Sequence, residues 1–334
     1  MKRMLGCCLL GFALVVAASS AAWAEAKELR VAKQYGLGYL QQMLMEDQKL
    51  VEKHARAAGL GEVKVTWSTF RSSDVMNDAL LSGNIEFASV GAPGLGVIWS
   101  RTRGTPQEVK AAFAYNYFPT ALNTRDPNIK TLADHTEKHK IAVPAVKVSN
   151  QAIFLQMAAA KLYGMANYTK FDALTVSMTH PDGMAAMLSG HGEITSHFTA
   201  VPFVQKELEK PGIRKIVSAD EILGAPNCHN FMIATKKFYT ENPKLYAAFL
   251  SAMREATDII NKDKRAAAEL YIRVTKDKSS PDDILKIMND KGNAYAFDIR
   301  PEGDMKTLQF MHQIGSIKVR AESWDDLLFP SPRK

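Results

Sequence analysis

Two features of this sequence could carry out catalysis: an isolated cysteine and a set of closely spaced histidines. Cys228 is the only cysteine beyond residue 8, so the later chain can form no internal disulfide. A cysteine nucleophile needs an oriented base, which the sequence does not identify, and a small buried residue is the commoner role of a lone cysteine. We therefore expect Cys228 to be structural.

The histidines do not form a recognisable metal or catalytic motif. His135 and His139 are four residues apart, but the segment is not HExxH, and the charges around it indicate a solvated loop or helix face. His180, His191 and His197 match no strong ligand spacing. The sequence also contains no GxGxxG, Walker A or GxSxG motif. These observations predict a protein that is not an enzyme and holds no metal or cofactor.

Anion binding is better supported, by loops rich in Gly, Ser and Asn that lie between a predicted strand and a predicted helix. Ligands of open α/β sheets bind beyond the carboxyl ends of the strands. The free N–H groups and positive dipole end of a helix start favour a negative charge there. The same residues could simply cap their helices, so the convergence of several loops carries the argument. The loops are 36–39, 70–73, 91–93, 148–151, 180–183 and 196–199.

The elements that position these loops alternate between strand and helix periodicity. Strands are predicted over 29–35, 63–70, 85–90, 109–115, 120–124, 140–144, 174–178, 193–198, 214–217 and 230–235. Helices are predicted over 40–58, 73–81, 95–100, 149–163, 182–188, 202–208, 243–261, 265–273, 281–288 and 304–314. This order predicts an α/β fold in which mostly parallel sheets are covered by helices on both faces.

The first residues have the pattern of a secretory signal peptide. Lys2 and Arg3 precede an apolar run over 4–18, and Ala22-Trp23-Ala24 fits a small-x-small cleavage site. We therefore predict that residues 1–24 are a signal peptide, that cleavage occurs near Ala24, and that the protein is periplasmic.

Length and composition indicate an ordinary globular protein of two domains. The chain has 334 residues, 46% hydrophobic and 23% charged, which is too long for one simple core. The formal net charge of +7 falls to +5 without Lys2 and Arg3, and no basic block is present. Nucleic-acid binding is therefore not expected.

Aromatic residues gather near the same loop ends, where they could wall a pocket for an organic ligand. Ordinary sheet packing is the alternative role for each of them. A bare inorganic ion would need fewer aromatic residues, so the set favours an organic anion. Its members are Tyr39, Phe70, Tyr115, Tyr117, Phe118, Phe198 and Phe231.

Five segments, in order along the chain, resemble the periplasmic substrate-binding proteins of the nitrate/sulfonate/taurine ABC importer family. The segments are VAKQYG (31–36), ALLSGNIEFASVGAPGLGV (79–97), HKIAVPAVKVSNQAIFLQMAAAKLYGM (139–165), VSMTHPDGMAAMLSGHGEI (176–194) and ATKKFYTENPKLYAAFLSAMREA (234–256). The resemblance implies a two-lobed, type II periplasmic-binding-protein fold with two crossing segments. Lobe one would comprise 25–115 and 230–334, and lobe two would comprise 120–225.

The resemblance also implies a set of ligand-binding positions. They are Tyr39, Phe70, Ala92 and Pro93 on lobe one, Ser149, Asn150, His197 and Phe198 on lobe two, and Asn227 and His229 on a crossing segment. Taurine-type members carry an acidic residue near the position of His229, and this chain has no carboxylate in that stretch. An anion without a positive group is therefore expected, with His197 and His229 as hydrogen-bond donors.

The function implied is that of the solute-binding component of an ABC importer. A monomer would capture a small anion (sulfonate-, nitrate- or aromatic-carboxylate-like) between its lobes and present it to an ABC permease in the inner membrane. Two alternatives stay open. One is an enzyme of related fold in thiamine-pyrimidine or chorismate-derived metabolism, although the cysteine-rich run of the pyrimidine synthase is absent. The other is an exported sensor subunit.

Overall fold

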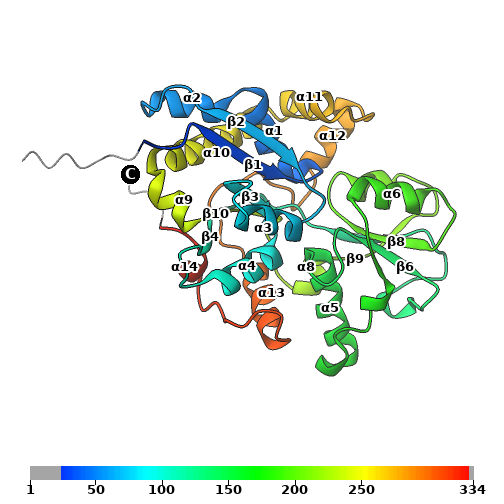
Figure 1. The fold of residues 1–334 in the computed structure, drawn as a ribbon. Helices are drawn as coiled ribbons and strands as arrows, with labels where there is room; N and C mark the ends of the chain where they lie inside the picture. The colour runs from blue at the N-terminus through cyan, green and yellow to red at the C-terminus, as the bar shows by residue number, and fades with distance from the viewer. Residues whose placement is uncertain (1–23, 331–334) are drawn as a thin grey trace, which may run out of the picture.

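Two five-stranded sheets lie at the centres of two lobes that stand side by side in a computed structural model describing residues 24–330 (Figure 1). The first sheet has the order β2-β1-β3-β10-β4, with β1 Glu28–Lys33, β2 Lys64–Thr69, β3 Phe87–Val90, β4 Val109–Tyr115 and β10 Asn230–Thr235. The second has the order β7-β6-β8-β5-β9, with β5 Ala121–Thr124, β6 Lys140–Val143, β7 Thr175–Ser177, β8 Ile194–Thr199 and β9 Arg214–Ser218.

Each sheet is mixed, with one strand running against the other four. In the first sheet β1 pairs in parallel with β2 and β3, while β10 lies antiparallel between β3 and β4. In the second sheet β6 pairs in parallel with β7 and β8, and β5 lies antiparallel between β8 and β9. The carboxyl ends of the parallel strands therefore gather at one edge of each sheet.

Helices cover both faces of the first sheet, as the pattern predicts. Two apolar clusters lie on its two faces, one containing residues of α1, α2 and α10, the other residues of α3, α4 and α13. The helices of this lobe are η1 Leu37–Tyr39, α1 Leu40–Asp47, α2 Leu50–Ala57, α3 Ser73–Leu81, α4 Ala92–Thr102, α9 Lys236–Glu241, α10 Pro243–Lys262, α11 Lys264–Thr275, α12 Pro281–Met288, α13 Glu302–Gln313 and α14 Trp324–Leu327.

The second lobe has its own core, in which Phe154 and Leu155 of α5 pack with Ile141, Val143 and other residues of the sheet. Its helices are η2 Leu132–Asp134, α5 Asn150–Tyr163, η3 Met165–Asn167, η4 Asp172–Leu174, α6 His180–Leu188, α7 Phe203–Leu208 and α8 Ala219–Leu223.

The predicted helix over 40–58 is two helices in the structure. The chain leaves the helical conformation at Lys49, whose φ of 50° is left-handed, and α2 begins at the next residue. A continuous apolar stripe does not reveal such a turn, because Leu44 before it and Leu50 and Val51 after it are all buried.

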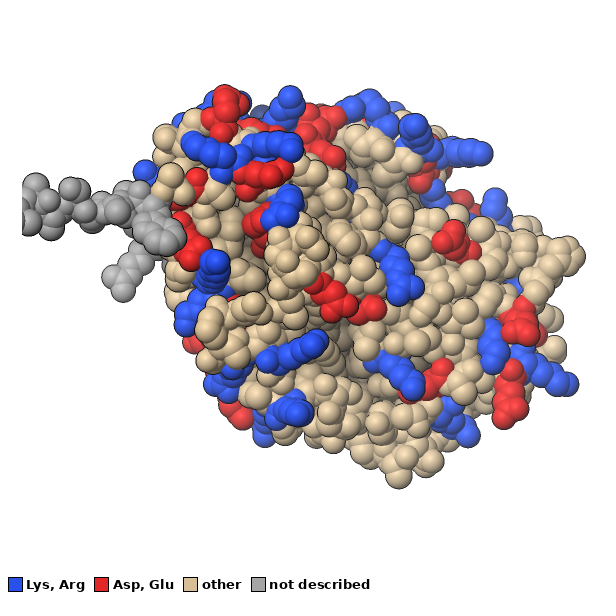
Figure 2. Space-filling view, viewed as in Figure 1, with Lys and Arg blue, Asp and Glu red and all other residues tan. Residues whose placement is uncertain are grey.

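Residues 1–23 of the predicted signal peptide lie outside the described residues. Within 24–330, the structure has no helix that combines the length and the apolar character needed to span a bilayer. Figure 2 shows Lys, Arg, Asp and Glu interspersed over one face of the molecule, without a block of one sign.

Candidate functional site

The loops that follow the strands of both lobes meet at a narrow cavity of about 20 Å³, which we call the polar pocket. Five of the six predicted loops contribute a residue to it, and the sixth holds one of these residues by a hydrogen bond. None of the eleven lining residues is Lys, Arg, Asp or Glu. They are Gln34, Tyr39, Ser73, Gly91, Pro144, Ser149, Asn150, Gln151, His180, His229 and Asn230.

On lobe one, the end of β3 brings a helix start to the pocket. Gly91 is the N-cap of α4, and its backbone N–H points to Ser73 Oγ at 3.4 Å. Gly91 has an extended backbone, with φ −77° and ψ 172°, so its conformation does not require glycine. Glycine is needed at position 91 for a steric reason, because a Cβ there would overlap the side-chain amide of Asn150 on the other lobe.

On lobe two, the segment after β6 places the start of α5 against the pocket. Ser149 caps this helix by accepting a hydrogen bond from Ala152 N at 3.3 Å, and its own hydroxyl donates to Ala145 O at 2.7 Å. The Ser149 hydroxyl is therefore engaged within the protein. The first backbone N–H groups of a helix have no acceptor within the helix, so Asn150 and Gln151 are the better donors to a ligand.

His180 enters the pocket from the end of β7, at the start of α6. Its Nδ1 lies 2.9 Å from Thr199 Oγ1, and its ring stacks on Phe203 with centroids 5.7 Å apart. Burial, with smaller contributions from His197 and His229, holds the pKa of His180 well below its usual value. The ring is thus neutral at neutral pH, and it can donate or accept one hydrogen bond towards the pocket.

His229 closes the opposite side, on the segment that returns to lobe one. It is 6% exposed, and burial lowers its pKa to about 4. Within residues 24–330 its Nδ1 has no hydrogen-bond partner, which is costly for a buried polar atom and points to a ligand or water. A Cβ at Gly38 would lie 2.5 Å from the ring, so glycine at 38 allows His229 its place.

The structure brings four of the ten predicted site residues to the polar pocket: Tyr39, Ser149, Asn150 and His229. Two more lie just outside it. Ala92 is buried in the first turn of α4, and Asn227 is buried with its amide donating to Cys228 O at 3.2 Å. Pro93 faces a different cavity, beside Val97 and Arg101.

The other three predicted residues pack within the lobes. Phe70 packs against the apolar cluster of α3 and α4, and Phe198 packs against Phe154 in the second lobe, with centroids 6.2 Å apart. His197 is fully buried on β8, where its Nδ1 lies 2.6 Å from Glu207 Oε1. Its Nε2 faces Gly183 and has no hydrogen-bond partner in the described part of the chain.

The prediction did not name Gln34, His180 and Asn230 as ligand-binding residues, although they line the pocket. Gln34 directly follows β1, and His180 begins the helix after β7, so both occupy the strand-end positions that predict a ligand loop. A rule that takes every polar residue at these positions would have included Gln34 and His180, but not Asn230, which begins the antiparallel strand β10.

An ion pair joins the two lobes beside the pocket. Lys206 Nζ on α7 lies 2.6 Å from Asp277 Oδ1, just beyond α11, and the two side chains are 19% and 11% exposed. Burial alone would raise the pKa of Asp277, but the hydrogen bonds from Lys206 and Ser279 together outweigh this effect and leave the pKa below its usual value. The Asp277 carboxyl therefore stays ionised at neutral pH, and its pair with Lys206 tethers the lobes.

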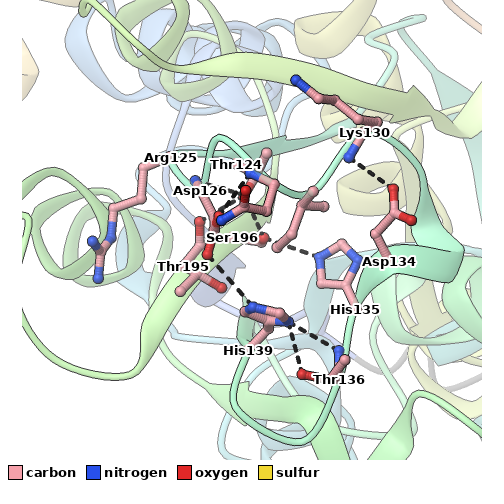
Figure 3. Close-up of polar contacts among 12 residues, drawn as sticks. Thr124, Arg125, Asp126, Lys130, Asp134, His135, Thr136, His139, Thr195 and Ser196 are labelled. Atoms are coloured by element: carbon pink, nitrogen blue, oxygen red, sulfur yellow. Dashed lines mark hydrogen bonds and ion pairs between the residues drawn. The ribbon is translucent and has the colours of Figure 1, made fainter.

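The histidine pair of the second lobe belongs to a separate network (Figure 3). His135 Nε2 lies 3.0 Å from Ser196 Oγ, and His139 Nδ1 accepts a hydrogen bond from Thr136 N at 2.9 Å. The expectation of a solvated segment is wrong for His135, which is 7% exposed because it packs against β8. Across residues 24–330, no three His, Cys, Asp or Glu side chains are grouped to hold a metal ion.

Cys228 is fully buried, and its Sγ contacts two backbone carbonyl oxygens, of Tyr115 at 3.1 Å and Asn230 at 2.8 Å. Burial, reinforced by the Asp304 charge, raises the pKa of the thiol well above its usual value. A thiol in this state is a poor nucleophile.

Solved structures of periplasmic binding proteins have the same fold. The periplasmic aliphatic sulphonate binding protein SsuA from Escherichia coli superposes with a TM-score of 0.66 at 19% identity, covering 91% of this chain and 99% of that chain. The periplasmic nitrate-binding protein NrtA from Synechocystis PCC 6803 gives a TM-score of 0.65 at 13% identity, covering 90% and 84%.

A third similar structure is the alkanesulfonate-binding protein SsuA from Xanthomonas axonopodis bound to MOPS. It has a TM-score of 0.63 at 14% identity and covers 91% of this chain and 97% of that chain. These likenesses confirm the predicted two-lobed periplasmic-binding-protein fold.

No curated protein sequence matches the chain. The sequence model of the NMT1-like family matches residues 22–274, which is 253 of the 334 residues. The chain therefore belongs to the NMT1-like family.

Proposed function

We propose that this protein is the solute-binding component of an ABC importer and captures a small anion between its lobes. The observation that carries the proposal is the composition of the polar pocket, which combines several helix starts, amide side chains and two imidazoles with no carboxylate. Such a lining offers hydrogen-bond donors to a negative charge and no partner for an ammonium group. The similar structures of two sulfonate-binding proteins and one nitrate-binding protein support the same class of ligand.

The mechanism follows from the position of the pocket between the lobes. A ligand held by Gly91 and Asn150 at the same time contacts both lobes, so it stabilises the closed arrangement more than an open one. The closed form would then present its joined surface to an inner-membrane permease. We propose a periplasmic location after signal-peptide removal, a monomeric state, and lobes at 25–115 with 230–334 and at 120–225.

The binding role of the remaining predicted residues is also part of the proposal. Tyr39, Asn150 and His229 would contact the ligand directly, and Ser149 would hold the helix start in place. Ala92 and Asn227 would shape the pocket wall. Phe70, Pro93, His197 and Phe198 would act only through the packing that supports these residues.

The test is binding by calorimetry and thermal shift on the purified exported protein, with nitrate, methanesulfonate, benzoate and taurine as probes. We expect a saturable heat and a rise in melting temperature for an anion without an ammonium group, because the ligand binds only the folded state. The variant His229→Asp should weaken that binding at least tenfold, since it places a negative charge in the pocket. His191→Asp, on an exposed loop, is the matched control and should bind normally.

Three further readouts separate the alternatives. Recovery of the bound anion unchanged after long incubation supports a binding protein, and its conversion would indicate an enzyme. Loss of uptake of the same anion in cells lacking the gene supports an importer over a sensor. If the protein binds none of the anions, the proposal is overturned.

A further inference from the structure

A second, much larger cavity adjoins the polar pocket. We call it the chamber, and it measures about 550 Å³. Its apolar wall comes from lobe one through Tyr35, Met43, Tyr271 and Val274, and from lobe two through Met184 and Phe203. The chamber thus also lies between the lobes, where α1 and α11 face α6 and α7.

The two cavities meet along a short boundary. Gln34 lines both of them. Beside it, His180 lines the polar pocket, and Phe203, which stacks on His180 at 5.7 Å, lines the chamber. The two cavities are therefore neighbours at Gln34 and at this ring stack.

The two cavities differ in volume, so they can hold different parts of a ligand. The polar pocket, at about 20 Å³, can admit only a small polar group, such as part of an anionic head. The chamber falls within the range of about 300–1,000 Å³ that is usual for organic ligands. A bare inorganic ion would fill the first and leave the second without a role.

The chemistry of the chamber suits an uncharged body. Its lysines Lys33 and Lys206 are each paired with a carboxylate, Glu46 and Asp277, at 2.5 and 2.6 Å. Lys276 stands exposed at the rim, where it adds positive potential for an approaching anion. Apart from Gln34, Thr69 and Thr275, the remaining wall is aromatic, aliphatic or backbone, and covering this apolar surface with a ligand is favourable.

We propose that the ligand is an elongated organic anion, with a carboxylate or sulfonate head in the polar pocket and an apolar body in the chamber. This inference rests on the proposed function and deepens it by naming the ligand class. The apolar body of the ligand would not contact Phe70, Phe198 and Phe231 of the predicted aromatic wall, since those residues pack within the lobes.

The test is a calorimetric series of straight-chain carboxylates and alkanesulfonates of one to eight carbons, with nitrate and sulfate as inorganic probes. Each methylene buried in the chamber should tighten binding about threefold to fourfold until the chamber is full. The two head chemistries form separate arms of the series, and the tighter arm identifies the head.

Two variants fill the chamber from opposite lobes: Met184→Trp on α6 and Val274→Trp on α11. Both positions are partly exposed, so the larger ring can be accommodated without disrupting a core. We expect each variant to lose the gain with chain length and to bind the one-carbon anions as the wild type does. Leu162→Trp adds the same ring at an exposed site of α5 and should keep the full gain.

Affinity that does not change with chain length, or that is highest for nitrate, would overturn the chamber proposal and leave the proposed function standing. Failure of every anion to bind would overturn both. Loss of the chain-length gain in Leu162→Trp as well would also count against the chamber, because that variant leaves it unfilled.

Discussion

The side-chain amide of Asn150 lies against the Cα of Gly91, so that the two lobes touch at a point where a single methyl group does not fit. Gly91 starts α4 on lobe one and Asn150 starts α5 on lobe two. The two helix starts thus face each other directly across the polar pocket. Their separation determines whether a ligand can contact both.

Gly91→Ala should weaken ligand binding about tenfold or more while leaving the melting temperature of the free protein within a few degrees. The added Cβ must displace Asn150 or keep the lobes apart, and the backbone at Gly91 already suits alanine. Calorimetry with the best anion measures the loss. The double variant Gly91→Ala/Asn150→Ala should relieve the clash and bind as Asn150→Ala alone does, so a further loss in the double variant would contradict the steric explanation.

Acid should destabilise the protein partly through His229. Its pKa is about 4 in the folded state and 6.5 for an unperturbed histidine, so between these values the unfolded chain binds the extra proton. Burial of the neutral His229 ring therefore costs no stability above pH 6.5. As the pH falls towards 4, the free energy of unfolding decreases by about 3 kcal/mol.

Denaturant titrations of wild type and His229→Gln at pH 7.5 and pH 4.5 measure this contribution. His180 and His135 also have lowered pKa values, mainly through burial, and they contribute in the same direction to both proteins. The difference between the two proteins isolates His229. An equal loss of stability in both would show that His229 is not buried in its neutral form.

Asp277→Asn should raise the apparent dissociation constant about threefold to tenfold, since the ion pair with Lys206 joins the lobes and favours the closed form. Binding by the wild type should also weaken with added salt more than binding by the variant, because a partly exposed pair is screened. Asp282→Asn removes an exposed pair with Arg265 within lobe one and is the control. An equal effect of both substitutions would mean that the Lys206 pair does not act on closure.

The buried pair of His197 and Glu207 should be a stability element of lobe two. Glu207 also accepts a hydrogen bond from Asn123 at 2.8 Å, so loss of one partner leaves buried polar groups unpaired. Glu207→Leu and His197→Leu should each lower the free energy of unfolding by about 3–5 kcal/mol, and the double variant by less than their sum. Additive losses in urea titrations would show that the two side chains are not coupled.

The order of strands and helices could be predicted because each element carries its own periodicity and ends at a local signal. Ser149 illustrates this, since it precedes an apolar run and does cap α5. The positions of strand ends then locate the ligand loops.

The direction of individual side chains could not be predicted in the same way. On β8, Phe198 points into the lobe-two core while His197 points to the opposite face, where Glu207 of α7 meets it. That meeting depends on how α7 packs against the sheet, which no local pattern records. The chamber is a stronger case, because Met184 and Val274 reach it from helices ninety residues apart.

The reversed strand β10 determines when lobe one can be completed. It lies between β3 and β4 but follows the whole of lobe two in the chain, so a nascent protein that ends before residue 230 has two unsatisfied strand edges side by side. The sheet of lobe two needs only residues 121–218 and can form earlier. Truncation just after α8 should therefore give a folded second lobe attached to an aggregation-prone first half.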